Sequence, residues 1–158
     1  MKEKRPSPVM RLLQWAGPER KWLILSVLCA FGSGILVITS YIGIYRLMDA
    51  VLSGACTKAV IADCALLVTA GTVGRLVLLG TSGALSHKGA YGALFRVRCM
   101  VTEHLAKVSL GALDERSTGA VKTVLNEDIE KLELFLAHNL PEFVAYLTGP
   151  VVIFLYLL

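Results

Sequence analysis

Residues 22 to 45 constrain this chain most, because none of these 24 residues is charged. As an α-helix with a rise of 1.5 Å per residue, the run would extend about 36 Å. That length crosses a hydrocarbon core of about 30 Å with some tilt. The sequence therefore predicts a membrane-spanning helix over 22–45.

A cleaved signal peptide is the competing interpretation of this run. Its apolar stretch exceeds the usual length of about 7–15 residues, and no Ala-x-Ala cleavage site follows it. Residues 52–56 bear a faint likeness to a lipoprotein cleavage box, but Arg46 and Asp49 intervene. A retained helix is favoured.

Apolar residues gather in two further blocks, near 59–86 and 143–158. Hydrophobic residues make up 55% of the chain and charged residues only 18%, against about 25% charged in an ordinary soluble domain. The last block has 16 residues, which is short for a complete crossing. We therefore expect an all-α membrane protein with two transmembrane helices plus part of a third, truncated within that helix. A soluble helical bundle is disfavoured by the 22–45 run.

The basic residues predict an orientation in the membrane. Six Lys and Arg residues precede the first apolar block, two lie between the first and second blocks, and seven lie between the second and third. Basic residues favour the cytoplasmic side. Residues 1–21 then form a cytoplasmic basic leader, and 87–141 lies inside. The 46–58 loop lies outside, with Ser53 and Gly54 as its turn. No stripe of basic and aromatic residues indicates a nucleic-acid partner.

The polar segment 87–141 keeps a helical periodicity on both sides of a break. Before the break, apolar residues recur at spacings of 3, 4, 4 and 3: Leu94, Val97, Val101, Leu105 and Val108. After it they recur at 4, 4, 3, 4, 4 and 3: Val121, Leu125, Ile129, Leu132, Leu136, Leu140 and Phe143. These stripes predict helices over 59–109 and 119–158 that pack as a long antiparallel cytoplasmic hairpin. Residues 110–118 form the turn, and Pro141 is expected to kink the returning helix.

Three short stretches around this turn resemble a known family. They are Leu110–Asp114, Ser117–Gly119 and Asn126–Leu132. They look like the first cytoplasmic loop of an ABC transporter of the exporter fold, where a short coupling helix precedes a Thr-Gly turn and a helix with an Asp. Ala137–Glu142 is similar to a pattern in the siderophore-handling subgroup. The resemblance covers roughly residues 10–158.

The resemblance implies that residues 22–158 are a partial transmembrane domain of an ATP-driven transporter in the inner (plasma) membrane. Its partners would be a nucleotide-binding domain, a second transporter subunit in a homo- or heterodimer, and the lipid membrane. No G-x-x-x-x-G-K-[ST] phosphate loop occurs in this sequence. We therefore expect no ATPase activity and no cofactor in this chain, with ATP and Mg²⁺ on the missing domain.

The hairpin tip is the first candidate site. The resemblance implies that it docks into a groove on the nucleotide-binding domain and transmits closure of that domain to the membrane helices. The residues concerned are Leu113, Asp114, Glu115, Arg116, Ser117, Thr118 and Gly119. From the residues alone, a plain solvated turn between packed helices is the simpler interpretation.

Arg75 is the second candidate, because a cation within a membrane helix costs about 2.5–3.5 kcal/mol and needs a partner or a wet cavity. Asp63 is too far along the same helix, about 18 Å away, to pair with it. Arg75 is expected to line a substrate pathway and attract an anion such as a ferric siderophore. An ion pair outside this chain, or snorkelling, remains open. Tyr41 and Tyr45 would border the cavity or form an aromatic rim.

The remaining reactive residues suggest no catalysis. Four cysteines and three histidines show no metal-ligand spacing, and the carboxylates over 127–133 lie on the polar helix face. Small residues four apart, Ala30 with Gly34 and Thr39 with Gly43, are expected to allow close helix contacts.

A different class remains open beside the transporter: a small membrane protein that assists assembly or regulation without transport. The DNA downstream of Leu158 discriminates the two, because an in-frame phosphate loop favours the transporter.

Overall fold

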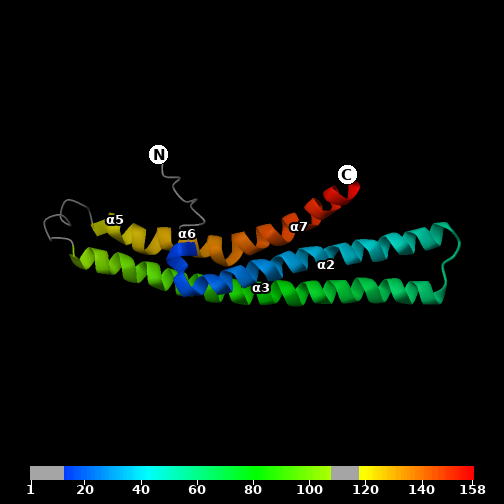
Figure 1. Ribbon diagram of the computed structural model, residues 1–158, viewed down its shortest axis with the longest axis horizontal. Coiled ribbons are helices and arrows are strands. Elements are labelled where there is room, and N and C mark those ends of the chain that lie inside the picture. The colour runs from blue at the N-terminus through cyan, green and yellow to red at the C-terminus, as the bar shows by residue number, and fades with distance from the viewer. Residues whose placement is uncertain (1–12, 108–117) are drawn as a thin grey trace. The chain divides into compact units, whose positions relative to one another are not determined.

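The computed structural model describes residues 13–107 and 118–158, and every regular element there is helical. A 3₁₀ turn spans Gly17–Glu19. The helices after it, labelled in Figure 1, are α2 (Arg20–Leu52), α3 (Lys58–Lys107), α5 (Thr118–Thr123), α6 (Ile129–Leu134) and α7 (Leu140–Leu157). Two π turns, Val124–Asp128 and Phe135–Asn139, connect α5 to α6 and α6 to α7. The predicted all-α fold is confirmed.

Three helical stretches within the described residues are long and apolar enough to cross a membrane. They are Leu13–Leu52, Lys58–Lys107 and Val121–Tyr156. The chain is therefore a membrane protein by length and composition of its helices. The predicted helices over 59–109 and 119–158 match two of these stretches closely.

The end of the first helix was predicted too early. α2 continues past Tyr45 to Leu52 and so includes Arg46 and Asp49. A charged residue such as Arg46 ends the uncharged run but does not end the helix. Arg, Leu, Met and Ala, which follow Tyr45, all have high helix propensity. The helix ends where predicted turn residues follow: Gly54 has φ +68°, and its N–H donates to the Val51 carbonyl. A left-handed residue after a helix is usually glycine.

The chain divides into two compact units. Unit 1 comprises the described residues of Met1–Leu25 and Leu85–Leu140, and unit 2 comprises Ser26–Ala84 and Pro141–Leu158. The helices α2 and α3 each contribute residues to both units.

Within unit 2, α2 and α3 run antiparallel (Figure 1) and are joined by reciprocal hydrogen bonds between two buried serines. Ser26 Oγ donates to the Ser82 carbonyl, and Ser82 Oγ donates to the Ser26 carbonyl, each at 2.8 Å. Both residues are at most 1% exposed. Between membrane helices such bonds contribute about 0.6 kcal/mol on average.

Close approach in unit 2 depends on the predicted small residues. A Cβ built on Gly34 would lie 2.6 Å from Thr148 Cβ in α7, and one built on Gly43 would lie 2.6 Å from Val68 Cγ2 in α3. Both distances are shorter than van der Waals contact, so only glycine fits. The expectation of close helix contacts at Gly34 and Gly43 is confirmed, each with a different partner helix.

Within unit 1, the two predicted apolar stripes pack against each other. Leu94 of α3 lies in one buried cluster with Ile129 and Leu136 of the returning stretch, and Val97 and Leu125 pack at its edge. The predicted antiparallel hairpin is thus confirmed as far as the described residues extend.

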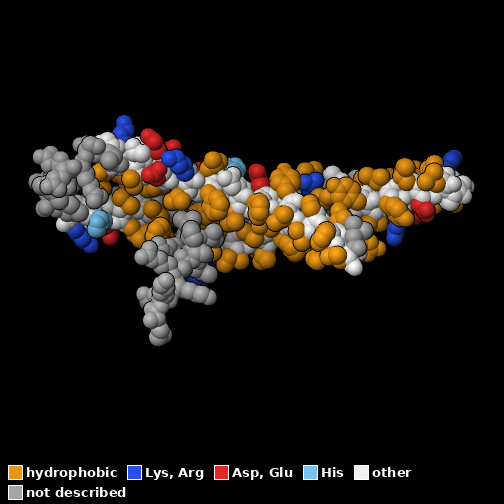
Figure 2. Space-filling model, turned by 90° about the horizontal axis from the view of Figure 1, so that it is seen from above, with side chains coloured by type: hydrophobic (Ala, Val, Ile, Leu, Met, Phe, Trp, Pro, Cys, Tyr) orange, Lys and Arg blue, Asp and Glu red, His pale blue; other side chains and the backbone are white. Residues whose placement is uncertain are grey.

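Large apolar side chains remain exposed along the helices. On α2 they include Leu28, Phe31, Ile35 and Ile42, whose spacings of 3, 4 and 7 place them on one helix face. In Figure 2, hydrophobic side chains form long stretches of the visible surface with charged side chains scattered between them. Such a surface requires lipid or partner helices rather than water.

Candidate functional site

Most of the predicted hairpin tip lies outside the described residues, which resume at Thr118. Leu113, Asp114, Glu115, Arg116 and Ser117 therefore have no described position. Thr118 and Gly119 are the first two residues of α5, and Gly119 is exposed. They open a helix, whereas the sequence placed Thr118 in the turn and began the helix at Gly119.

The predicted substrate-pathway residues lie on two helices of unit 2. Tyr41 and Tyr45 are exposed on α2, and Arg75 is half-buried on α3. None of the three forms a hydrogen bond or ion pair within the described residues. Arg75 therefore finds no charged partner in this part of the chain, as its 18 Å separation from Asp63 along α3 predicts.

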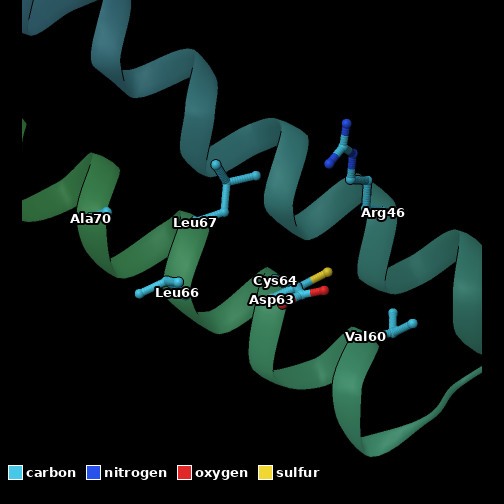
Figure 3. A pocket seen from close by; sticks show the side chains of 7 residues that line it. All are labelled: Arg46, Val60, Asp63, Cys64, Leu66, Leu67 and Ala70. Carbon is cyan, nitrogen blue, oxygen red and sulfur yellow. The ribbon is translucent and has the colours of Figure 1, made fainter.

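A cavity of about 610 Å³ lies elsewhere in unit 2, between α2 and α3 (Figure 3). Its lining residues are Arg46, Val60, Asp63, Cys64, Leu66, Leu67 and Ala70. None of the predicted pathway residues lines it. The sequence did not predict that Arg46 and Asp63 line one cavity, because the residues of α2 and α3 that face each other depend on helix register.

The chemistry of this cavity is amphiphilic. Arg46 offers a guanidinium from α2, Asp63 offers a carboxylate from α3, and the other lining residues on α3 are mostly aliphatic. The thiol of Cys64 belongs to a buried residue, 5% exposed. All four cysteines lie within the described residues, and all four are free.

Two of the three histidines contact each other in unit 1. His87 of α3 meets His138 of the second π turn edge to face, with ring centroids 4.7 Å apart. His87 Nδ1 is buried and has no hydrogen-bond partner among the residues that the structure describes. His104 lines an apolar cavity with Trp15 and Val97. Within the described residues, no three His, Cys, Asp or Glu side chains gather to hold a metal ion.

Residues 137–142, singled out by the sequence, have a structural role next to the His pair. Pro141 has no N–H, so it cannot donate the hydrogen bond that an α-helix would send to the carbonyl of Ala137. Ser86 Oγ of α3 donates to that carbonyl at 2.7 Å in a buried setting. Serine side chains commonly satisfy the carbonyls that prolines leave free in membrane helices.

The acidic residues of the returning stretch lie mainly in a polar environment. Glu127, Asp128 and Glu130 are exposed, whereas Glu133 is half-buried. Asp128 accepts a hydrogen bond from Lys131 Nζ at 3.0 Å, one turn along the same stretch. An exposed pair of this kind contributes little to stability. The predicted solvated face is confirmed for the first three carboxylates.

Comparison with known proteins gives one family match. Residues 23–158 match the family described as "ABC transporter transmembrane region". A search among curated proteins gave no match.

Proposed function

Because this chain belongs to the family of ABC transporter transmembrane regions, we propose that it forms part of the substrate pathway of an ATP-driven transporter. In this proposal ATP and Mg²⁺ bind a separate nucleotide-binding domain, and this chain converts closure of that domain into movement of its helices. A second transporter subunit, identical or related, completes the pathway across the inner membrane.

The observation that supports this proposal best is that one chain contains both an apolar unit, unit 2, and a hairpin with a polar outer face, unit 1. Unit 2 leaves a stripe of α2 exposed, including Leu28, Phe31 and Ile35. Unit 1 instead has a core of its own, with Leu94, Ile129 and Leu136, and a charged outer face. The presence of both an exposed apolar stripe and a packed polar hairpin in one chain favours a transporter domain over a self-contained assembly factor.

The tip of that hairpin, residues 113–119, is the proposed contact with the nucleotide-binding domain. Two packed helices form a stiff lever, and a displacement at its end is transmitted to its base. The packed core around Leu94 and Ile129 supports this role, because a lever whose helices slide past one another transmits little.

Photo-crosslinking tests the contact. A photo-activated cross-linker is attached to a cysteine introduced by Ser117→Cys, in a chain whose four native cysteines are replaced by alanine or serine. The chain is expressed in membranes that contain candidate ATP-binding subunits. We expect a covalent product whose partner peptide derives from a protein with a G-x-x-x-x-G-K-[ST] phosphate loop.

The same cross-linker at Asp49 of α2 is the matched control and should give no such product. Absence of a phosphate-loop partner at position 117, or its presence at position 49, would contradict the proposed docking and orientation.

The proposed substrate pathway includes Arg75 with Tyr41 and Tyr45. A half-buried guanidinium without a charged partner among the described residues attracts an anion. A ferric siderophore is one anionic substrate of this kind. The siderophore is proposed only from the resemblance of residues 137–142 to a subgroup pattern. Ala137 and Pro141 of that stretch are buried and have the packing role described above. The substrate class therefore stays a prediction.

A further inference from the structure

We propose that unit 1 contains a binding site for the phosphate group of an anionic phospholipid, formed by Lys21, Trp22 and Lys88. Two ammonium groups from different helices lie close to one indole ring. Lys88 Nζ is 3.8 Å from the centroid of the Trp22 ring, and Lys21 Nζ is 5.2 Å from it. Both distances are within the range of cation–π attraction.

The backbones around this cluster are held in close contact. A Cβ built on Gly89 would lie 2.8 Å from Leu23 Cγ and 3.2 Å from the Leu23 backbone nitrogen. Leu23 is 2% exposed and Ala90 is fully buried. The residue after Trp22 and the residue after Lys88 are thus fixed against each other. The core therefore fixes the two backbones from which the Lys88 side chain and the indole extend.

The two lysines lack a carboxylate partner. Both are exposed, and neither forms an ion pair within the described residues, where the recorded pair joins Lys131 to Asp128. Two exposed ammonium groups near one ring repel each other weakly in water, and an anion bound by both would relieve that repulsion. An anion held by two ammonium groups would satisfy both, and each ammonium offers three N–H donors.

The position of the cluster along both helices identifies the anion as a lipid headgroup. Trp22 is the first residue of the uncharged run on α2, and Lys88 follows the apolar block 59–86 on α3. Both helices therefore change from apolar to polar at this level. Tryptophan rings favour the headgroup layer, and basic residues at a membrane surface attract anionic lipids. A phosphate diester lies at this depth.

Fluorescence quenching by brominated lipid tests the site in the full chain. Trp15→Phe leaves Trp22 as the single tryptophan. The protein is reconstituted in vesicles of roughly four parts phosphatidylcholine to one part phosphatidylglycerol, with bromine on the acyl chains of one lipid at a time. At equal mole fraction, brominated phosphatidylglycerol should quench Trp22 several-fold more effectively.

Lysine substitutions then measure the contribution of each ammonium. Lys88→Gln should lower the preference for phosphatidylglycerol about fivefold, and adding Lys21→Gln should abolish it. Lys88→Arg keeps the charge and should keep the preference. Lys107→Gln, an exposed lysine later on α3, is the matched control and should change nothing.

Two outcomes would overturn the proposal. Equal quenching by the two brominated lipids in the Trp15→Phe chain would show that Trp22 has no selective neighbour. Loss of the preference on adding inorganic phosphate, but not sodium chloride of equal ionic strength, would assign the site to a free anion. Quenching by brominated phosphatidylcholine verifies that each variant is inserted, so loss of folding is recognised separately.

Discussion

Arg75 is the residue whose environment bears most directly on transport. It lies half-buried on α3, between Gly71 and Gly80, and no described side chain pairs with it. A guanidinium at this depth costs about 2.5–3.5 kcal/mol when it is isolated. We propose that a substrate anion offsets this cost.

Substitution of Arg75 in the assembled transporter tests this role. Arg75→Ala is expected to raise the half-saturating concentration of an anionic substrate about tenfold, because charged hydrogen bonds contribute about 1.5–3 kcal/mol. Arg75→Lys keeps the charge and should retain most of the affinity. The measurement is substrate-stimulated ATP hydrolysis.

Arg46→Ala, which changes a cavity charge outside the proposed pathway, is the control for Arg75. Unchanged substrate dependence of Arg75→Ala together with a lower protein yield would instead assign Arg75 a structural role.

At the scale of elements, the returning stretch from Thr118 to Leu157 shows how a proline is accommodated. The α-helical hydrogen bond from residue 141 to Ala137 is impossible, and a π turn over Phe135–Asn139 precedes it. The hydroxyl of Ser86 instead reaches the Ala137 carbonyl at 2.7 Å. This bond connects α3 to the returning stretch at the level of the His87 and His138 contact.

A double-mutant cycle tests this compensation. Ser86→Ala should destabilise the chain by about 1 kcal/mol, because it removes a donor from a buried carbonyl. In a Pro141→Ala background the new N–H can serve the Ala137 carbonyl, so the cost of Ser86→Ala should fall. The measurement is unfolding by denaturing detergent, followed by circular dichroism.

Thr81→Ala provides the matched control, since the Thr81 hydroxyl is exposed and donates within its own helix to Val77. Strictly additive costs for Ser86→Ala and Pro141→Ala would contradict the coupling.

At the scale of the whole molecule, the prediction to test is the orientation of the chain in the membrane. The charge distribution places the loop after α2 outside and residues 87–141 inside. Two native cysteines are suitable probes, because Cys56 in that loop and Cys99 on α3 are both exposed.

Single-cysteine variants give a direct readout of orientation. A chain that retains only Cys56 should react with a membrane-impermeant maleimide in intact cells. A chain that retains only Cys99 should react only after the membrane is permeabilised. Cys29 and Cys64 are replaced by alanine in both chains. The reverse labelling pattern would show that the hairpin lies outside, and docking to a cytoplasmic ATPase would then be impossible.

Sequence reasoning located the helices but misjudged some of their ends. The uncharged run from Trp22 to Tyr45 identified α2, yet the helix continues to Leu52 because Arg46 and Asp49 remain compatible with helical geometry. Ser53 and Gly54 were predicted as the turn, and the positive φ of Gly54, which glycine adopts without strain, is consistent with this. Pro141 was expected to kink the helix. The sequence did not predict that Ser86 donates the hydrogen bond that Pro141 cannot give to Ala137, because Ser86 and Pro141 are 55 positions apart.

The sequence by itself determined that this protein is helical and resides in the membrane. Backbone polar groups in lipid must be satisfied within each segment, so long apolar runs can only be helices. The tertiary structure alone decided which residues meet: Lys88 with Trp22, Thr148 with Gly34, and Ser86 with Ala137. Those contacts depend on the rotation and register of neighbouring helices, and the periodicity of a single helix does not specify either.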